Sequence, residues 1–493
     1  MTLLKLYNKK LLVVFLAMVL VSCSNPWDDR ENKGDANLNV NLTEAIINTA
    51  QTSQFGQLLV QTGYDKILAS SKTFTVFVPT NEAMAEVDDA ILNDPDALKQ
   101  FVSNHIALTA YSSVRSGEET QIKMYSNKYL LFEGSTMIDD ATIITADHYA
   151  KNGVYHIVNK ALTPKLNIWQ YINTQAGNSE MADYLLSLSS KEYSIYESDI
   201  DAKTLSEEKG AGYLADSLTN SYLKNVYNLN NEKNSYTLFL MKDTGYGVEV
   251  DKMKPYLIKT SNDSEKDSTA IYASYFTLRD LAFAKKYEKA DLPTKLISRF
   301  GVEVPIDKTK IVEEIHLSNG IVYVMEQVEV DLDKRLLTTQ IEGEDNTGYA
   351  NGTRNKIFYR NKYDPIKQMY YDDIMVQNPG VGRFTLYYSA KDFYSTTYKV
   401  YWRAINDRQT NVFQQYLRIG GERDEEGIVT NVIKSLPYTN VEVNFFEEVY
   451  LGEFTLEQAR DIDLISLIAA DNTTNGNNSL TLDYLKFVPQ IKL

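Results

Sequence analysis

The residue of this chain with the most specific chemical setting is Cys23, the only cysteine among 493 residues. Three lysines within the first ten residues and an almost unbroken apolar run over residues 11–21 (LLVVFLAMVLV) precede it. A basic start, a short apolar core and a small residue before a cleavage point are typical of a secretory signal peptide. The run is too short for a membrane-spanning helix, which needs about 20 apolar residues. We therefore expect an exported chain that is cleaved close to Cys23.

Residues 20–23 (LVSC) resemble a bacterial lipobox. The resemblance implies that residues 1–22 are a lipoprotein signal peptide and that Cys23 is acylated, which ties the chain to a membrane. Residues 23–37 are polar and acidic and are expected to form a flexible tether. An acidic cluster at residues 28–31 resembles the surface-export signal of lipoproteins in glycan-foraging Gram-negative bacteria, and a plain solvated linker is the alternative. The expected location is the outer membrane, lipid-anchored and exposed on the cell surface.

Two Tyr-x-Arg pairs, Tyr401 with Arg403 and Tyr416 with Arg418, are the candidate ligand-binding residues. Both occur in segments whose alternation predicts strands, with the pairs on the outward faces. An aromatic plane beside a guanidinium fork suits a sugar ring and its hydroxyl groups. The alternative is an exposed sheet face whose arginines pair with some of the 66 acidic residues.

Composition argues against several other classes of function. The net charge of −16 disfavours nucleic acid binding, which needs basic stripes. Four histidines and one acylated cysteine leave little for a transition metal, so we predict no metal and no cofactor. The chain has no G-x-S-x-G or H-E-x-x-H motif, and residues 471–476 lack the ligand order of an EF-hand loop. We expect a protein that is not an enzyme; a glycosidase pair of carboxylates stays open as an alternative.

The elements that would carry these residues begin with a domain over residues 38–165. Residues 42–59 place apolar side chains at helical spacing. Residues 72–78 (KTFTVFV) predict a buried strand that ends at Pro79, because proline gives no N–H to a ladder. The Asn-Gly dipeptide at residues 152–153 predicts a hairpin turn.

Residues 75–84 (TVFVPTNEAM) closely resemble the first signature of the fasciclin domain, and residues 152–162 (NGVYHIVNKAL) resemble the second. The resemblance implies a mixed α/β domain with a β-sandwich-like core and a wrap of helices, and adhesion or ligand binding rather than catalysis. The family's adhesive Tyr-His pair reads Asn104-His105 here. We therefore expect His105 and His156 to be hydrogen-bonded core histidines rather than a transferred adhesion site.

The same pattern recurs over residues 166–332. Residues 235–241 (SYTLFLM) resemble the first signature and residues 318–325 (SNGIVYVM) the second, at a similar spacing. Two copies of one supersecondary plan explain this recurrence. The segment is predicted to be a second, diverged fasciclin domain.

Residues 335–493 predict an all-β domain, because short strands alternate with Gly and Asn turns. The expected strands cover residues 356–359, 383–388, 397–404, 412–419, 441–446 and 479–489. Alternation points Val400, Trp402 and Leu417 into its core. The last strand, residues 479–489, resembles the closing strand of galactose-binding-like jelly rolls. The expected fold class is α+β multidomain: two fasciclin-type mixed α/β domains followed by an all-β sandwich or jelly roll.

These observations predict a cell-surface lipoprotein that acts as a non-catalytic binding or adhesion module. The family resemblances imply association with glycan and partnership with an outer-membrane glycan importer. An adhesin for host matrix or other cells is the alternative within the same class, and a glycoside hydrolase is the alternative outside it. The expected partners are a membrane, reached through the lipid on Cys23, an importer complex, and a glycan or matrix protein, with no nucleic acid.

Overall fold

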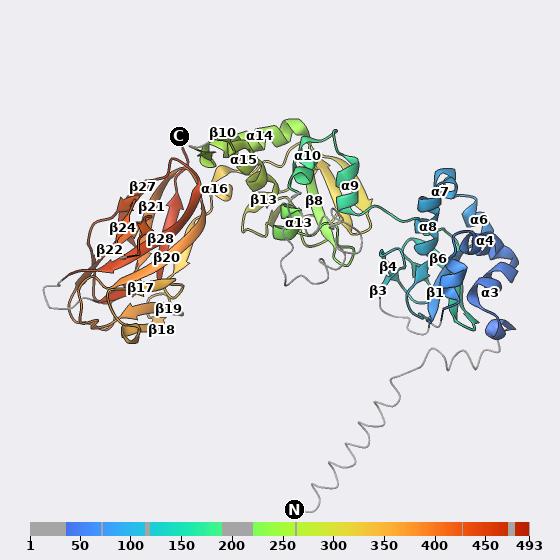
Figure 1. Ribbon diagram of the computed structural model, residues 1–493, viewed down its shortest axis with the longest axis horizontal. Helices are drawn as coiled ribbons and strands as arrows, with labels where there is room; N and C mark the ends of the chain where they lie inside the picture. The colour runs from blue at the N-terminus through green and yellow to red at the C-terminus, as the bar shows by residue number, and fades with distance from the viewer. Residues whose placement is uncertain are drawn as a thin grey trace, which may run out of the picture.

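The computed structural model describes residues 36–70, 72–113, 119–189, 220–261, 264–425, 427–471 and 479–492. Figure 1 shows three units along the chain, with a second α/β unit placed between a first α/β unit and a β-sandwich. Cys23 and the predicted signal peptide lie outside the described residues. Among the helices of the described part, none has the length and apolar character needed to cross a membrane.

The first α/β unit contains one seven-stranded sheet in the order β2-β1-β7-β6-β5-β4-β3. Its strands are β1 (Phe74–Pro79), β2 (Ile106–Ala107), β3 (Thr120–Lys123), β4 (Tyr129–Phe132), β5 (Met137–Ile138), β6 (Ala141–Ala150) and β7 (Gly153–Val158). Its helices are η1 (Ala36–Asn39), α3 (Leu42–Asn48), η2 (Ala50–Thr52), α4 (Ser53–Gln61), α5 (Tyr64–Leu68), α6 (Asn81–Met84), α7 (Asp89–Asn93) and α8 (Pro95–Ser103). The central parallel strands β1 and β7 are buried on both faces, by the helices on one side and by β3–β6 on the other.

The two signature segments form the predicted elements for local reasons. Strand β1 ends at Pro79, and Thr80 Oγ1 accepts from Ala83 N at 3.2 Å to cap α6. Asn152 in the β6–β7 turn accepts from the amide of Leu42 (2.8 Å) and donates to a carbonyl of α5 (2.5 Å). A Cβ on Gly153 would lie 2.2 Å from a carbonyl oxygen of β1, so only glycine fits there. The predicted strand and hairpin are confirmed.

The second α/β unit has a four-stranded sheet in the order β11-β8-β15-β14, the same local arrangement as β2-β1-β7-β6. Its strands are β8 (Tyr236–Met241), β9 (Thr260–Ser261), β10 (Ser264–Asp267), β11 (Ala282–Phe283), β12 (Lys295–Ile297), β13 (Glu303–Pro305), β14 (Ile311–Leu317) and β15 (Gly320–Met325). Its helices are α9 (Ile168–Thr174), α10 (Glu180–Ser187), α13 (Ser221–Asn225), α14 (Asp243–Met253), η4 (Lys254–Tyr256), α15 (Thr269–Leu278), η5 (Lys308–Lys310) and α16 (Leu332–Arg335). Strands β8 and β15 are parallel, as β1 and β7 are.

The third unit is a β-sandwich of a four-stranded sheet, β16-β30-β21-β27, and a larger sheet, β17-β20-β28-β22-β25, with a separate β18-β19-β29 sheet at one end. The elements of the two main sheets are β16 (Thr339–Glu342), β17 (Gly348–Ala350), β20 (Thr385–Phe393), β21 (Thr397–Arg403), β22 (Phe413–Ile419), β25 (Lys434–Ser435), β26 (Thr439–Val441), β27 (Val449–Thr455), β28 (Arg460–Ala469) and β30 (Tyr484–Pro489). The remaining elements are η6 (Arg354–Lys356), β18 (Ile357–Asp364), β19 (Met369–Val376), β23 (Glu422–Arg423), β24 (Val429–Thr430) and β29 (Leu480–Leu482).

Two predicted strands of the sandwich differ from the structure. The strand expected over residues 479–489 breaks at Asp483 into β29 and β30, which belong to different sheets. The strand expected over residues 441–446 ends at Val441, and the rest is loop. Alternating apolar residues signal extended backbone, but they do not show where a chain crosses from one sheet to another.

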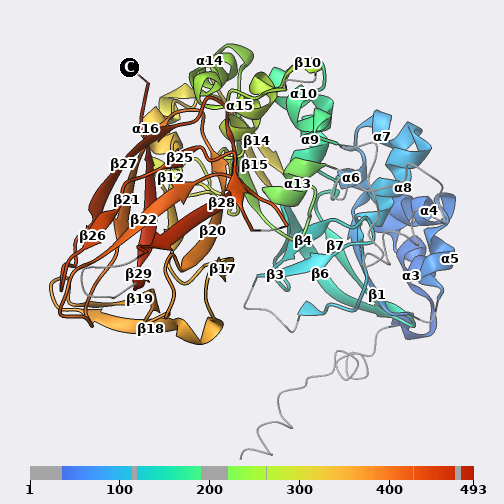
Figure 2. The same cartoon turned by 60° about the vertical axis from the view of Figure 1, so that its left-hand side comes forward.

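The two junctions between units differ in kind. Lys128 of the first unit is buried against the second unit, where it pairs with Glu232 and donates to Gln170 (2.9 Å) and Ser318 (3.2 Å). Burial lowers the pKa of this ammonium group. The second unit and the sandwich instead share one continuous apolar core. Figure 2 shows the sandwich joined to that unit beside α16, with the first unit on the opposite side of it.

Candidate functional site

Arg403, one of the four predicted ligand-binding residues, is buried rather than outward-facing. Its side chain is 4% exposed, and its terminal nitrogens pair with the carboxylates of Asp364 and Asp483. Its Nε donates to Phe446 O at 2.7 Å. The strand alternation holds, but Asp364 at the end of β18 and Asp483 between β29 and β30 cover this end of the sheet. Arg403 therefore joins the β18-β19-β29 sheet, the end sheet, to the sandwich through these ion pairs. The prediction that its side chain faces solvent is wrong.

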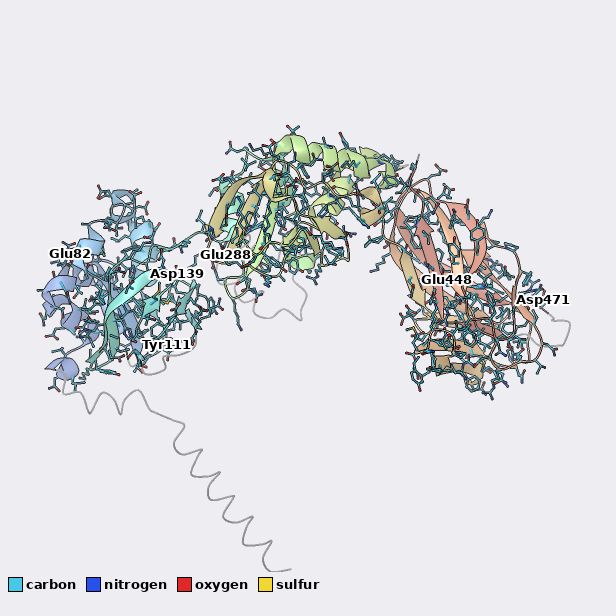
Figure 3. The ribbon with its side chains drawn as sticks, turned by 180° about the vertical axis from the view of Figure 1, so that it is seen from behind. Glu82, Tyr111, Asp139, Glu288, Glu448 and Asp471 are labelled. Carbon is cyan, nitrogen blue, oxygen red and sulfur yellow. The ribbon has the colours of Figure 1, made fainter. Side chains whose placement is uncertain are left out.

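Tyr401, the partner of Arg403 in sequence, lies half-buried on the outer face of the four-stranded sheet. Its ring is 5.4 Å from that of Tyr450, which is 51% exposed. Lys486 Nζ lies 5.9 Å from the Tyr401 ring centroid and pairs with Glu448 at 2.9 Å. Tyr484 also donates to Glu448, at 2.8 Å (Glu448 is labelled in Figure 3). The polar groups of this face already bond one another.

Tyr416 and Arg418 lie on the outer face of the larger sheet, half-exposed as predicted. Arg418 Nη2 donates to the Tyr416 hydroxyl at 3.2 Å, and the Tyr416 ring is 4.6 Å from that of Tyr438. Arg383 pairs with Asp471 at 2.6 Å (Asp471 is labelled in Figure 3), and both charges act on the Tyr438 phenol. Burial raises the pKa of Tyr438, so its hydroxyl is protonated and can donate at neutral pH.

The two predicted pairs do not form one site. Val400 and Trp402 of β21 and Leu417 of β22 point into the shared core, which confirms the predicted faces. Since Tyr401 and Tyr416 alternate with these residues, they point away from each other on opposite sides of the sandwich.

A third surface, which the sequence analysis missed, lies on the β18–β19 hairpin. Tyr359, Tyr363 and Tyr370 are 47%, 49% and 68% exposed, and the register places all three on one face of the hairpin. Asn361 and Asp372 share that face, and Asn361 Nδ2 donates to Asp372 Oδ1 at 2.8 Å. The rings of Tyr363 and Tyr370 are 5.2 Å apart. We call these five residues the tyrosine ledge.

Charged side chains on the opposite face of the hairpin hold the ledge in place. Arg360 binds both oxygens of buried Asp373 and reaches Asp407 at 2.9 Å, and Lys362 reaches Asp407 at 2.8 Å. Burial acts to raise the pKa of Asp407, but hydrogen bonds and charges from Lys362 and Arg360 hold it below its usual range. Buried ion pairs with several hydrogen bonds fix geometry. The ledge is therefore exposed to solvent and is also held in a fixed geometry.

The sequence did contain a signal for the ledge. Residues 357–364 alternate Tyr359, Asn361 and Tyr363 with the charged residues that bond inward. The strand predicted over residues 356–359 stops short of the end of β18, and no strand was predicted over residues 369–376, where β19 lies. Ion pairs replace apolar residues on the inward face of this hairpin, so hydrophobic periodicity does not reveal it.

The two histidines of the first unit are core residues, as predicted. His105 is fully buried; its ring bonds Phe101 O and Leu162 N, each at 2.9 Å. Burial lowers the pKa of His105 to about 4 and also lowers that of His156. Both rings are therefore neutral at physiological pH.

One group of described side chains has the composition of a metal site. Ligand atoms of Glu288, Glu314 and His316 all lie within 4.8 Å of one another. Lys286 already pairs with Glu288 at 2.9 Å, and His316 lies 3.1 Å from Glu314. These surface pairs account for the cluster without a cation. Residues 472–478, the body of the rejected calcium loop, lie outside the described residues.

Comparison with known proteins places the first unit in a family. Residues 50–164 match the fasciclin domain, which confirms that prediction. Protein sll1483 from Synechocystis is 31% identical over 108 residues, covering 20% of this chain and 59% of that protein. Transforming growth factor-beta-induced protein ig-h3 from Oryctolagus cuniculus is 30% identical over 115 residues, covering 21% of this chain and 16% of that protein. The chain thus spans less than two thirds of either relative.

Solved structures give weaker likenesses. A FAS1 domain pair from the insect cell adhesion molecule Fasciclin I covers 58% of this chain and 99% of its own, at 18% identity and a TM-score of 0.23. A CBM36 domain of a xylanase from the hindgut metagenome of Trinervitermes trinervoides covers 32% of this chain and 100% of its own, at 16% identity and a TM-score of 0.21. These TM-scores are too low to bear on function. The assignment of a sandwich rests on its strand order.

Proposed function

We propose that this chain is a non-catalytic, lipid-anchored surface protein whose C-terminal sandwich binds glycan through the tyrosine ledge. The observation that carries the proposal is three solvent-exposed tyrosines on one face of a braced hairpin, with an amide and a carboxylate between them. Contiguous exposed apolar surface on a soluble domain marks a binding surface, because leaving it in water is unfavourable.

The chemistry of the ledge suits a saccharide chain. Tyrosine rings offer flat apolar faces for the C–H faces of pyranose rings, and tyrosine hydroxyls bond sugar hydroxyls. The Tyr359 hydroxyl already donates to Asn346 Oδ1 at 2.7 Å, which leaves the hydroxyls of the other two ledge tyrosines for this role. Tyr359 and Tyr363 are four residues apart on one strand, roughly 14 Å at ~3.4 Å per residue. Asn361 and Asp372 lie between them as hydrogen-bonding partners for hydroxyl groups. A ligand lying along the hairpin would therefore meet ring, polar group and ring in turn.

The test is affinity electrophoresis of the soluble chain in gels that contain xylan or galactomannan. We expect at least one of these neutral glycans to retard the wild-type chain, and the triple change Tyr359→Ala, Tyr363→Ala, Tyr370→Ala to weaken retention at least tenfold. The control is Tyr401→Ala with Tyr450→Ala, which removes an aromatic pair from another face and should leave retention unchanged. Equal retention of both variants and wild type would rule the ledge out.

The anchor is proposed from Cys23 and the segment before it. Cys23→Ser should move the chain from the outer-membrane fraction to the soluble fraction and abolish labelling by a radioactive fatty acid. Retention of label would contradict acylation at this residue. Pulldown of the lipidated chain from outer membranes tests partnership with a glycan importer, and recovery of the chain alone would count against it.

Adhesion through the first unit is the second candidate, and the fasciclin match over residues 50–164 favours it. Binding of the full chain to immobilised matrix proteins distinguishes the two proposals. Matrix binding that survives the ledge triple change would assign adhesion to another surface. Release of reducing sugar from a retained glycan would instead support an enzyme.

A further inference from the structure

Arg418 on the outer face of the larger sheet has no carboxylate partner among the described residues, although the chain carries 66 acidic residues against 50 basic ones. The arginines that brace the sandwich, Arg360 and Arg403, each bind two carboxylates. Arg418 instead donates to the neutral hydroxyl of Tyr416, at 3.2 Å. A half-buried guanidinium without a counter-charge is a positive point in a negative protein.

Ser466, directly opposite Arg418, adds a second unsatisfied group. Residues in direct register on neighbouring antiparallel strands share a face, so Ser466 of β28 lies beside Arg418 on the outer face. Ser466 is 1% exposed, and its hydroxyl has no hydrogen-bond partner among the described residues. A buried polar group without a partner is rare and needs a reason. An unpaired hydroxyl next to an uncompensated guanidinium group is a pair of donors suited to an anionic group.

The surroundings supply a wall and a second cation. The Tyr438 ring, 44% exposed, meets the Tyr416 ring edge to face at 4.6 Å. Arg383 lies near the same two tyrosines and pairs with Asp471. The neighbourhood therefore holds two guanidinium groups, those of Arg383 and Arg418, and one carboxylate. Its net charge is positive, opposite to that of the whole chain.

We infer that Tyr416, Arg418, Tyr438 and Ser466 form a second saccharide site that selects a sugar bearing an anionic group, a carboxylate or a sulfate. A planar guanidinium binds such a group through two parallel N–H donors, and the bond is stronger than one to a neutral hydroxyl. The tyrosine pair would pack against the sugar ring. This inference rests on the proposal that the sandwich binds glycans, and it adds a preference for charge that the ledge does not have.

The two sites would bind either the same polysaccharide molecule or two different ones. The ledge lies on the end sheet, and Arg418 lies on the outer face of the larger sheet, so neither site shares a residue with the other. Linked sites raise apparent affinity without any new contact, provided that one ligand spans both. A heteropolymer of neutral and acidic sugars would then be retained more strongly than either homopolymer.

The experiment measures retention of the soluble full chain in gels that contain polygalacturonate, with its methyl ester as the uncharged match. Dextran sulfate and dextran form the second pair and separate sulfate from carboxylate. We expect retention by at least one anionic polymer that exceeds its neutral match and weakens as salt is raised. Arg418→Gln should weaken that retention at least tenfold, Arg418→Lys less so because the fork is lost but the charge is kept, and Tyr438→Ala should weaken it too.

The controls separate this inference from the proposed function. Tyr450→Ala on the opposite face should change nothing, and an unchanged thermal midpoint of Arg418→Gln excludes misfolding. Retention by neutral glycan that needs the ledge, with no effect of Arg418→Gln on any polymer, would overturn this inference alone. Retention by an anionic polymer that needs Arg418, with no effect of the ledge triple change, would overturn the ledge proposal alone. Retention by no polymer would overturn both.

Discussion

In the two α/β units, equivalent side chains form equivalent hydrogen bonds around the central strands. In the first unit, Thr75 Oγ1 donates to a loop carbonyl (2.8 Å) and accepts from the amide of Tyr111 (2.7 Å). In the second, Thr237 Oγ1 donates to a loop carbonyl (2.8 Å) and accepts from the amide of Tyr287 (2.9 Å). Asn152 and Asn319 likewise each bond the first helical amide and a carbonyl near the strand.

The side chains that fill the space between these bonds differ. His156 stacks on Phe77 at 5.3 Å and bonds the carbonyl of Tyr111 at 2.9 Å. At the matching position Tyr323 stacks on a phenylalanine at 5.7 Å and donates to the carbonyl of Tyr287 at 2.9 Å. The backbone carbonyl of His105 accepts a hydrogen bond from β1. In the second unit the residue at this position is a leucine.

This difference shows which residues the fold requires. Groups that satisfy buried backbone recur in both units, because an unpaired buried amide or carbonyl costs about 1–3 kcal/mol. The histidines do not recur. At the position of His156 a different ring that fills the space and bonds one carbonyl is sufficient, and at the position of His105 only the backbone carbonyl is kept. The histidines at the centre of the first unit are therefore parts of its core, and binding has to be sought on its surfaces.

Gly153 and Gly320 give the strongest test of the shared framework. A Cβ would lie 2.2 Å from Phe74 O in the first unit and 2.0 Å from Tyr236 O in the second. Neither carbonyl can move, because both belong to central strands, so we expect each Gly→Ala change to lower the free energy of unfolding by about 3–5 kcal/mol. Calorimetry should show Gly153→Ala acting on the transition of the first unit and Gly320→Ala on the other.

Gly247 supplies the matched control. It lies inside helix α14, where an added Cβ meets nothing within 4 Å. Gly247→Ala should stabilise the second unit by roughly 0.5–1 kcal/mol, because alanine loses less backbone entropy in a helix. Equal, small effects of all three changes would show that the close approach is not a constraint.

Asn152 and Asn319 should have the next largest effect. Asn152 accepts from one amide and donates to one carbonyl, and Asn319 accepts from one amide and donates to two, so Asn→Ala leaves at least two backbone groups unpaired and should cost about 2–3 kcal/mol in either unit. Urea denaturation measures this loss. Asn319→Asp keeps the acceptor but turns a buried carboxylate oxygen toward the two carbonyls, so it should be at least as damaging as alanine; an aspartate that preserved wild-type stability would contradict the assigned bonds.

The framework was readable from the sequence because its residues have local signatures. Asn-Gly turns, a proline at a strand end and runs of β-branched residues each act on their own neighbours, so the central strands β1, β7, β8 and β15 followed from them. The elements of the binding surfaces had no such signature. Arg403 was placed outward because alternation describes one strand, whereas its burial depends on Asp364 and Asp483 from distant segments.

The spatial arrangement of the four candidate residues was not predictable for the same reason. Alternation assigned Tyr401 and Tyr416 correctly to outward faces, but it could not show that their strands belong to different sheets. The tyrosine ledge was missed because its hairpin is held by ion pairs to Asp373 and Asp407 instead of by apolar residues. A site depends on which distant segments come together in the fold. Local sequence patterns, such as alternation along one strand, do not show this.

Acid should distinguish the two units by a smaller amount. Burial lowers the pKa of His105 to about 4, whereas the unfolded chain titrates near 6.5. The unfolded state binds more protons between these values, so stability is full above pH 6.5 and falls as pH drops toward 4. We expect the first transition to lose about 2 kcal/mol between pH 8 and pH 5 relative to the second. His105→Leu should reduce this difference without abolishing it, because burial also lowers the pKa of His156, and it should carry a cost at neutral pH from the unpaired Leu162 amide.

Tyr323→His, which gives the second unit the side chain of the first, should have the smallest effect. The imidazole can stack on Phe239 and reach the Tyr287 carbonyl as His156 reaches that of Tyr111, so we expect a loss of only about 1 kcal/mol at pH 8. Burial would lower the pKa of the new histidine and the nearby carboxylates of Glu314 and Glu288 would oppose that shift, so the second transition should acquire part of the acid sensitivity of the first, losing stability as pH falls below 6.5. Thermal melts at pH 8 and pH 5 measure both effects. If the second transition stayed insensitive to acid after this exchange, the difference between the units would lie outside the position of His156, and the match between the two frameworks would not extend to their cores.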